Sequence, residues 1–98
     1  MTVYEAYSII KKKNGNKVLT ECYDTKDFFA FGFCTPEMIG VPVGGGYWTV
    51  KKNDGSIGKT SYVVNMEAFD NSTPIDIRLL DDFWKTHNIE DYLKKSLD

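Results

Sequence analysis

The sequence predicts an α+β domain in which helices pack against one antiparallel sheet. Three observations predict it: a capped amphipathic stretch at the N-terminus, four strand-like segments joined by turn residues, and helically spaced apolar residues after Pro74. Strands that follow one another along the chain, with helices gathered before and after them, are typical of this class. Because 98 residues fit one hydrophobic core, we expect a single domain over residues 1–98.

We expect the first helix over residues 3–13. Thr2 and Glu5 have the spacing of a capping box, in which two side chains satisfy backbone N–H groups at the helix start. Apolar residues then recur at helical spacing: Val3, Tyr4, Ala6, Tyr7 and Ile10. The helix should end at Asn14-Gly15-Asn16, because Asn and Gly tolerate left-handed backbone.

The next part of the chain predicts a four-stranded antiparallel meander over residues 17–22, 28–34, 46–52 and 56–64. The second segment is apolar at nearly every position, which indicates a central strand covered on both faces. The third follows the glycine run 44–46 and ends at Asn53-Asp54-Gly55, a strong hairpin signal.

The C-terminal third predicts helices packed on the sheet. Residues 67–69 form a short helical turn in this prediction, and residues 71–74 form a turn. Ile77, Leu80, Phe83 and Trp84 then follow three- and four-residue spacing. Asn88 and Asp91 have the pattern of another helix start.

Composition excludes several classes of partner. A net charge of −2 offers no basic surface for nucleic acid, and no segment approaches the roughly 20 apolar residues of a membrane span. The first residues lack a signal-peptide pattern, because the basic residues follow the short apolar stretch. We therefore expect a soluble cytoplasmic protein, a monomer or weak homodimer, whose partner is a basic or neutral protein.

The sequence offers no catalytic or metal-binding pattern. His87 is the only histidine and falls at an expected helix end, where an imidazolium interacts favourably with the helix dipole. Cys22 and Cys34 have no zinc-motif spacing, and we expect buried free thiols, although a disulfide stays open if their strands pair. The glycine run lacks the P-loop pattern. We expect no enzyme activity, no metal and no cofactor.

Residues 20–58 resemble a group of small bacterial proteins. The run Glu21-Cys22-Tyr23-Asp24 is followed by Asp27-Phe28-Phe29-Ala30-Phe31, and Gly44-Gly45-Gly46-Tyr47 leads into Val50-Lys51-Lys52-Asn53-Asp54-Gly55-Ser56-Ile57. This pattern resembles small immunity proteins of polymorphic and contact-dependent toxin systems, whose sheet is similar to cystatin-like or PepSY-like domains.

The resemblance implies an inhibitor that binds a cognate toxin domain and covers its active site without any chemistry. An acidic inhibitor associates faster with a toxin that carries a basic groove. Acidic side chains at turns and an apolar loop bounded by two prolines give the candidate contacts: Asp24, Asp27, Glu37, Met38, Ile39, Asp70, Asp81 and Asp82.

The alternative function is a small ligand-binding or regulatory module of unknown ligand. Its sheet and helix would enclose a pocket with aromatic walls, formed by Phe29, Phe31, Phe33, Tyr47 and Trp48. The same residues also suit an ordinary core, since a domain of this size needs its aromatics inside. A subunit of a homo-oligomer is a third possibility. The strand order, the binding face and the activity of the toxin stay open.

Overall fold

The computed structural model describes residues 1–39, 46–88, 90 and 91. Its elements in chain order are α1 (Val3–Asn14), β1 (Val18–Asp24), β2 (Phe28–Cys34), the 3₁₀ turn η1 (Pro36–Met38), β3 (Tyr47–Lys51), β4 (Ile57–Thr60), α2 (Met66–Asp70), β5 (Thr73–Pro74), the 3₁₀ turn η2 (Ile77–Leu79) and α3 (Phe83–Thr86). This is the predicted α+β class. In the described part of the chain, no helix has the length and apolar character needed to cross a membrane.

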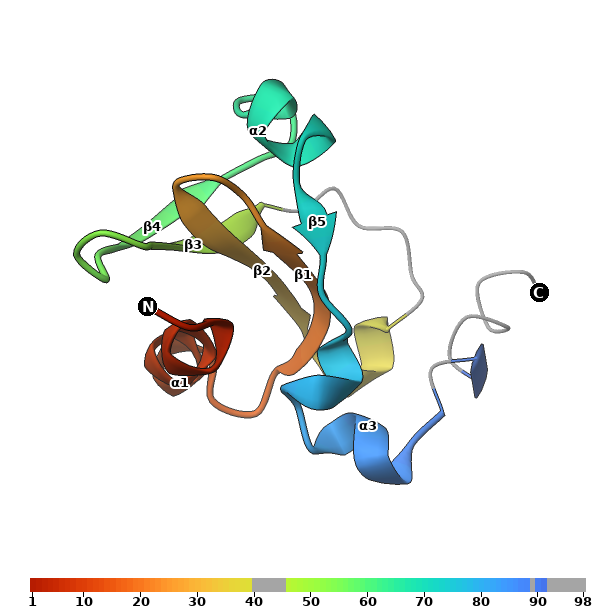
Figure 1. Ribbon diagram of the computed structural model, residues 1–98. Helices are drawn as coiled ribbons and strands as arrows, with labels where there is room; N and C mark the ends of the chain where they lie inside the picture. The colour runs from red at the N-terminus through yellow and green to blue at the C-terminus, as the bar shows by residue number, and fades with distance from the viewer. Residues whose placement is uncertain (40–45, 89, 92–98) are drawn as a thin grey trace.

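The sheet has five antiparallel strands in the order β4-β3-β2-β1-β5 (Figure 1). The predicted four-strand meander is confirmed, and β2 is central as its apolar sequence indicates. The fifth strand corrects the prediction of a turn over residues 71–74. Thr73 and Pro74 pair with Asp24 and Tyr23, and the N–H of Ile75 donates to the carbonyl of Cys22 at 2.8 Å. Proline is tolerated there because β5 is an edge strand.

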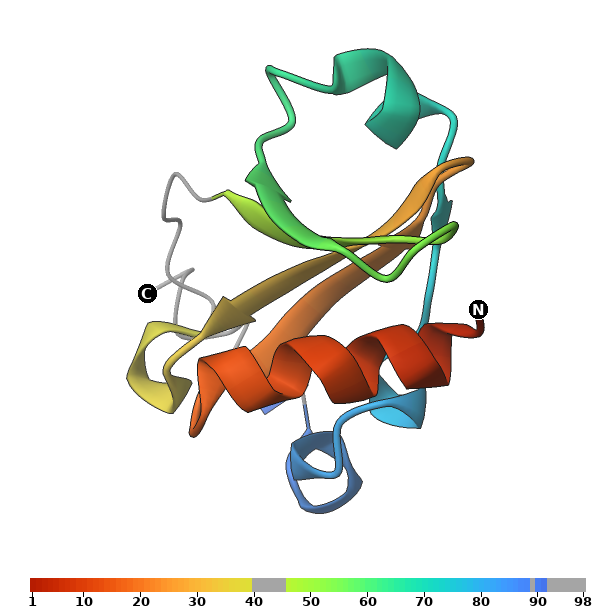
Figure 2. The same ribbon diagram turned by 90° about the vertical axis from the view of Figure 1, so that its left-hand side faces the viewer.

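The first helix forms as predicted and extends one residue further. The N–H of Glu5 donates to Thr2 Oγ1 at 3.2 Å, and the N–H of Thr2 donates to Glu5 Oε1 at 3.0 Å, which completes the capping box. Gly15 follows with φ at 53°, a conformation that favours glycine. Figure 2 shows α1 lying along one face of the sheet.

The main core lies between α1 and the sheet. Side chains alternate along a strand, so β2 sends Phe29, Phe31 and Phe33 toward α1 and Phe28 toward the opposite face. Phe31 is fully buried, with its ring centroid 6.2 Å from that of Tyr7. The buried members of the cluster are Ala6, Ile10, Val18, Leu19, Cys22, Phe29, Phe31, Ile39, Val50, Ile77 and Trp84.

The chain between β4 and β5 covers the second face of the sheet. The predicted strand over residues 56–64 ends at Thr60, because the N–H of Asn65 donates to the carbonyl of Ser61 and closes a turn. The segment then arches over the sheet on the side opposite α1 (Figure 2). Phe69 of α2 anchors it, with ring-centroid distances of 4.9 Å to Tyr47 and 5.8 Å to Tyr23.

The predicted helix after Pro74 is broken into η2 and α3. Asp81 lies between them, and its carboxylate accepts the N–H of Leu19 at 2.9 Å and the N–H of Phe83 at 3.0 Å. Trp84 Nε1 donates to the carbonyl of Leu19 at 2.7 Å. Both backbone groups of Leu19 are thus satisfied at the part of the β1 edge that β5 does not reach. The predicted helix start at Asn88 leads mainly into residues outside the described part.

Candidate functional site

The eight candidate contact residues fall at two opposite ends of the molecule, so one compact interface does not contain them all. The β1–β2 turn and α2 lie at one end, and η1, η2 and α3 lie at the other (Figures 1 and 2). At the first end, Asp24 is half-buried and forms an ion pair with Lys52. Asp27 is exposed in the turn, and the exposed Asp70 accepts the hydroxyl of Tyr62 at 2.7 Å.

At the second end, only part of the predicted set is accessible. Glu37 and Met38 are exposed on η1, and Asp82 is exposed and forms an ion pair with Lys85 at 2.9 Å. Ile39 and Asp81 have exposed fractions of 4% and 7%. Their side chains support the fold, Ile39 through the core and Asp81 through the hydrogen bonds to Leu19 and Phe83.

Sequence reasoning missed the most exposed apolar stretch of the described chain. Tyr62, Val63, Val64 and Met66 have exposed fractions of 44%, 77%, 75% and 47%. We call residues 62–66 the apolar arch. The sequence placed part of it in a strand, where alternate residues would be buried, but the turn after Thr60 lifts it off the sheet. Contiguous exposed apolar side chains are a mark of protein interaction sites.

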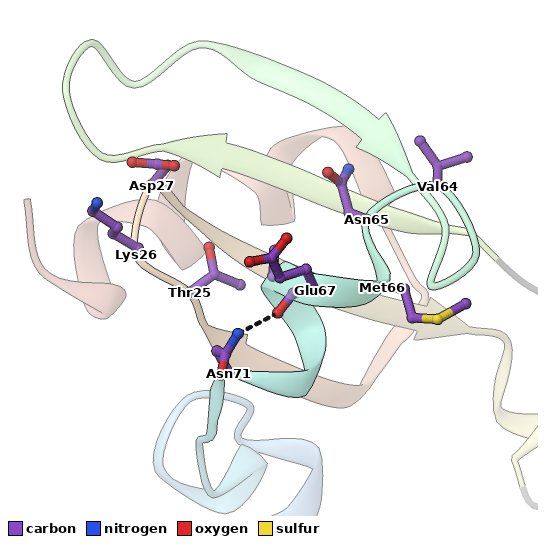
Figure 3. A pocket seen from close by; sticks show the side chains of 9 residues that line it. Thr25, Lys26, Asp27, Val64, Asn65, Met66, Glu67 and Asn71 are labelled. Atoms are coloured by element: carbon purple, nitrogen blue, oxygen red, sulfur yellow. Dashed lines mark hydrogen bonds between the residues drawn. The ribbon is translucent and has the colours of Figure 1, made fainter.

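A groove of about 580 Å³ lies beside the apolar arch, between α2 and the β1–β2 turn. The turn contributes Thr25, Lys26 and Asp27. The other wall consists of Val64, Asn65, Met66, Glu67, Ala68 and Asn71. Figure 3 shows the Glu67 carboxylate between α2 and the turn. Asp27 is the one predicted contact residue in this lining, and Glu67 was not predicted.

Three side chains around the groove donate hydrogen bonds within the protein. Asn71 Nδ2 donates to the carbonyl of Glu67 at 2.9 Å, and Asn65 Nδ2 donates to Thr60 Oγ1. The Thr25 hydroxyl donates to the carbonyl of Phe28 at 2.7 Å. The carboxylates of Asp27 and Glu67 add acceptors to the lining that a cationic partner group can use.

A cluster of Glu21, Tyr23 and Tyr47 on the sheet lies beneath α2. Glu21 Oε1 accepts the hydroxyls of Tyr23 at 2.9 Å and Tyr47 at 3.3 Å. Burial and the Glu21 carboxylate raise the pKa of both tyrosines above its ordinary value, so the hydroxyls stay protonated. A side chain in place of Gly32 would crowd this arrangement, because its Cβ would lie 3.3 Å from Glu21. Phe69 of α2 packs against the rings of Tyr23 and Tyr47.

The five aromatic residues of the alternative function lie on two different faces of the sheet. Phe29 and Phe31 are buried in the core between α1 and the sheet, and Phe33 and Trp48 pack against that core. Tyr47 lies on the opposite face, against Phe69. The five residues therefore belong to two packing clusters on opposite faces of the sheet.

Cys22 and Cys34 lie on the neighbouring strands β1 and β2, and His87 follows α3. Cys22 and Cys34 are free thiols, and they are not cross-strand partners, because Cys22 faces Phe31 and Cys34 faces Val18. Burial raises the pKa of Cys22 to about 12. His87 is exposed at the end of α3, with Nδ1 3.0 Å from the carbonyl of Phe83. Within residues 1–39, 46–88, 90 and 91, no three potential metal ligands come together.

No protein-family model matches this chain, and neither the curated proteins nor the solved structures include a significant match to it. The resemblance to immunity proteins therefore stays a prediction. What supports a function is the arrangement of the apolar arch, the groove and the acidic side chains at the α2 end.

Proposed function

We propose that this chain is an immunity protein, which binds a cognate bacterial toxin and covers its active site through the α2 end without catalysis. The observation that carries the proposal is the apolar arch, where Val63 and Val64 are 77% and 75% exposed side by side. Fully burying a valine side chain contributes roughly 1.5 kcal/mol. Burying two such side chains together supplies a substantial part of the binding free energy of a tight complex.

The charges around the apolar arch favour a basic partner. Asp27, Glu67 and Asp70 are exposed at this end, and the whole chain has a net charge of −2. Toxins that act on nucleic acids tend to have basic grooves, and complementary charge speeds association and fixes orientation. The resemblance of residues 20–58 to immunity proteins supports the same class of partner.

The α2 end is also braced, which suits an inhibitor that works by steric occlusion. Phe69 packs among Tyr23, Phe28, Tyr47 and Tyr62. The Tyr62–Asp70 hydrogen bond joins the start of the apolar arch to the end of α2. A surface that is already ordered loses less conformational entropy on binding.

The proposal predicts a complex with the product of the neighbouring upstream gene. The tagged chain is co-expressed with that protein, purified, and tested for rescue of growth when the partner is toxic. We expect a stable complex and restored growth. If the purified proteins stay separate and the cells are not rescued, the proposed function is wrong.

A further inference from the structure

We propose that the groove beside α2 is a docking site for an arginine side chain of the partner protein. This inference rests on the proposed function, because the partner protein is the toxin named there. The groove is continuous with the apolar arch, because Val64 and Met66 belong to both. A partner surface that covers the arch would therefore also meet the mouth of the groove.

The apolar side of the groove suits the stem of a long cationic side chain. Val64, Met66 and Ala68 line the wall opposite the β1–β2 turn. Arginine and lysine bury their methylene groups along such surfaces while the charged head reaches polar groups. The volume of about 580 Å³ leaves room for the head group and for water.

The charge of the lining selects a cation. Among the lining residues, the carboxylates of Asp27 and Glu67 outnumber the ammonium of Lys26. In the described part of the chain, the ion pairs join Asp24 to Lys52, Asp76 to Arg78 and Asp82 to Lys85, so neither groove carboxylate takes part in one. The two carboxylates lie on opposite walls of the groove, Asp27 on the β1–β2 turn and Glu67 on α2 (Figure 3).

The hydrogen-bonding groups favour arginine over lysine. Asn65 and Asn71 each use one N–H of Nδ2 for a neighbour within the protein, and their Oδ1 atoms can accept hydrogen bonds alongside the two carboxylates. Guanidinium presents five N–H donors in a planar fork and pairs with carboxylates through two parallel hydrogen bonds. An ammonium group has three donors and acts as a compact point charge.

The test uses small probes instead of the toxin. The ¹⁵N-labelled chain is titrated with N-acetyl-arginine methylamide, with the corresponding lysine compound, and with N-acetyl-citrulline methylamide, which keeps the shape of arginine without its charge. We expect saturable NMR shifts at residues 25–27 and 64–71 with the arginine probe, with a dissociation constant on the order of 10 mM because one side chain makes few contacts. Citrulline should cause no saturable shift.

Variants then test the two carboxylates. The double variant Asp27→Asn, Glu67→Gln should weaken binding of the arginine probe at least about fivefold, the change expected from removing charge-assisted hydrogen bonds at an exposed site. The matched control is Glu37→Gln, which neutralises an exposed carboxylate on η1 at the other end and should leave the titration unchanged.

Equal shifts with citrulline, tighter binding of the lysine probe, or an unchanged titration in the double variant would overturn the arginine site. This result is independent of the co-expression experiment. A complex that forms and rescues growth, together with no arginine binding, rejects only the groove proposal. Arginine binding without complex or rescue rejects only the immunity function.

Discussion

At the scale of single residues, the fold depends most visibly on Asp81. Its buried carboxylate accepts the backbone N–H groups of Leu19 and Phe83. The pKa of Tyr7 lies far above its ordinary value, mainly because the side chain is partly buried. The negative charge of Asp81 and the hydrogen bond between Tyr7 and Asp81 raise this pKa further. Asp82, the next residue, is exposed and forms an ion pair with Lys85. Two adjacent aspartates therefore have different roles.

Replacing Asp81 with alanine should lower the free energy of unfolding by about 1–3 kcal/mol, because the buried N–H of Leu19 loses its acceptor. Asp82→Ala is the matched control and should change stability by less than about 0.5 kcal/mol, since exposed ion pairs contribute little. Urea unfolding of the three proteins measures both. Equal effects of the two substitutions would contradict the role assigned to Asp81.

Residue roles could be predicted where the partners are close in sequence. The capping box joins Thr2 and Glu5, three positions apart, and the sequence predicts it correctly. The carboxylate of Asp81 accepts from a residue 62 positions earlier, and no local pattern indicates such a contact. The same limit explains why Asp81 and Ile39 were predicted as surface contacts although the fold buries both.

At the scale of elements, α2 is held by one aromatic anchor. It has five residues, too few to be stable as an isolated helix. Phe69 is 9% exposed and contacts four other aromatic rings, which fixes α2 and the adjoining apolar arch on the sheet. The binding surface proposed here therefore depends on packing beneath it.

Phe69→Ala should release the segment over residues 61–72 while the rest of the fold persists. We expect amide hydrogen exchange in α2 to accelerate at least about 30-fold, equivalent to a local loss of about 2 kcal/mol, with α1 and β2 unchanged. Tyr62→Phe is the control, because it keeps the ring and removes only the hydroxyl bound by Asp70. Faster exchange throughout the sheet would show that Phe69 belongs to the global core.

Long periodic elements could be predicted, and so could the short helical turn at residues 67–69, which is α2 in the structure, but β5 could not. Apolar spacing located α1 and β2, and the Asn-Asp-Gly turn located the β3–β4 hairpin. The two-residue β5 has no periodicity, and its pairing with Tyr23 and Asp24 depends on the path of the preceding chain. The apolar residues after Pro74 do lie in helical turns, but not in one continuous helix. The contacts of Asp81 and Trp84 with Leu19 separate η2 from α3.

At the scale of the whole molecule, the sheet separates two different layers. One face packs against α1 and forms the main core, while the other carries the smaller aromatic cluster under α2 (Figure 2). The α+β class could be predicted because it depends only on the order of the elements. Of the residues in the proposed binding surface, the sequence predicts Asp27 and Asp70 as contacts, whereas Glu67, Val63 and Val64 come together only through the apolar arch.

The most direct test of a binding surface at the α2 end is the affinity of the purified chain for its toxin domain by calorimetry. The variants are Val63→Asp with Val64→Asp, and Leu79→Asp, which alters an equally apolar side chain, 63% exposed, on η2 at the other end. We predict that the valine pair loses at least about 100-fold in affinity, near 3 kcal/mol, and that Leu79→Asp changes it less than threefold. Full affinity in the valine variant with a large loss for Leu79→Asp would place the interface at the η2 end and contradict the account.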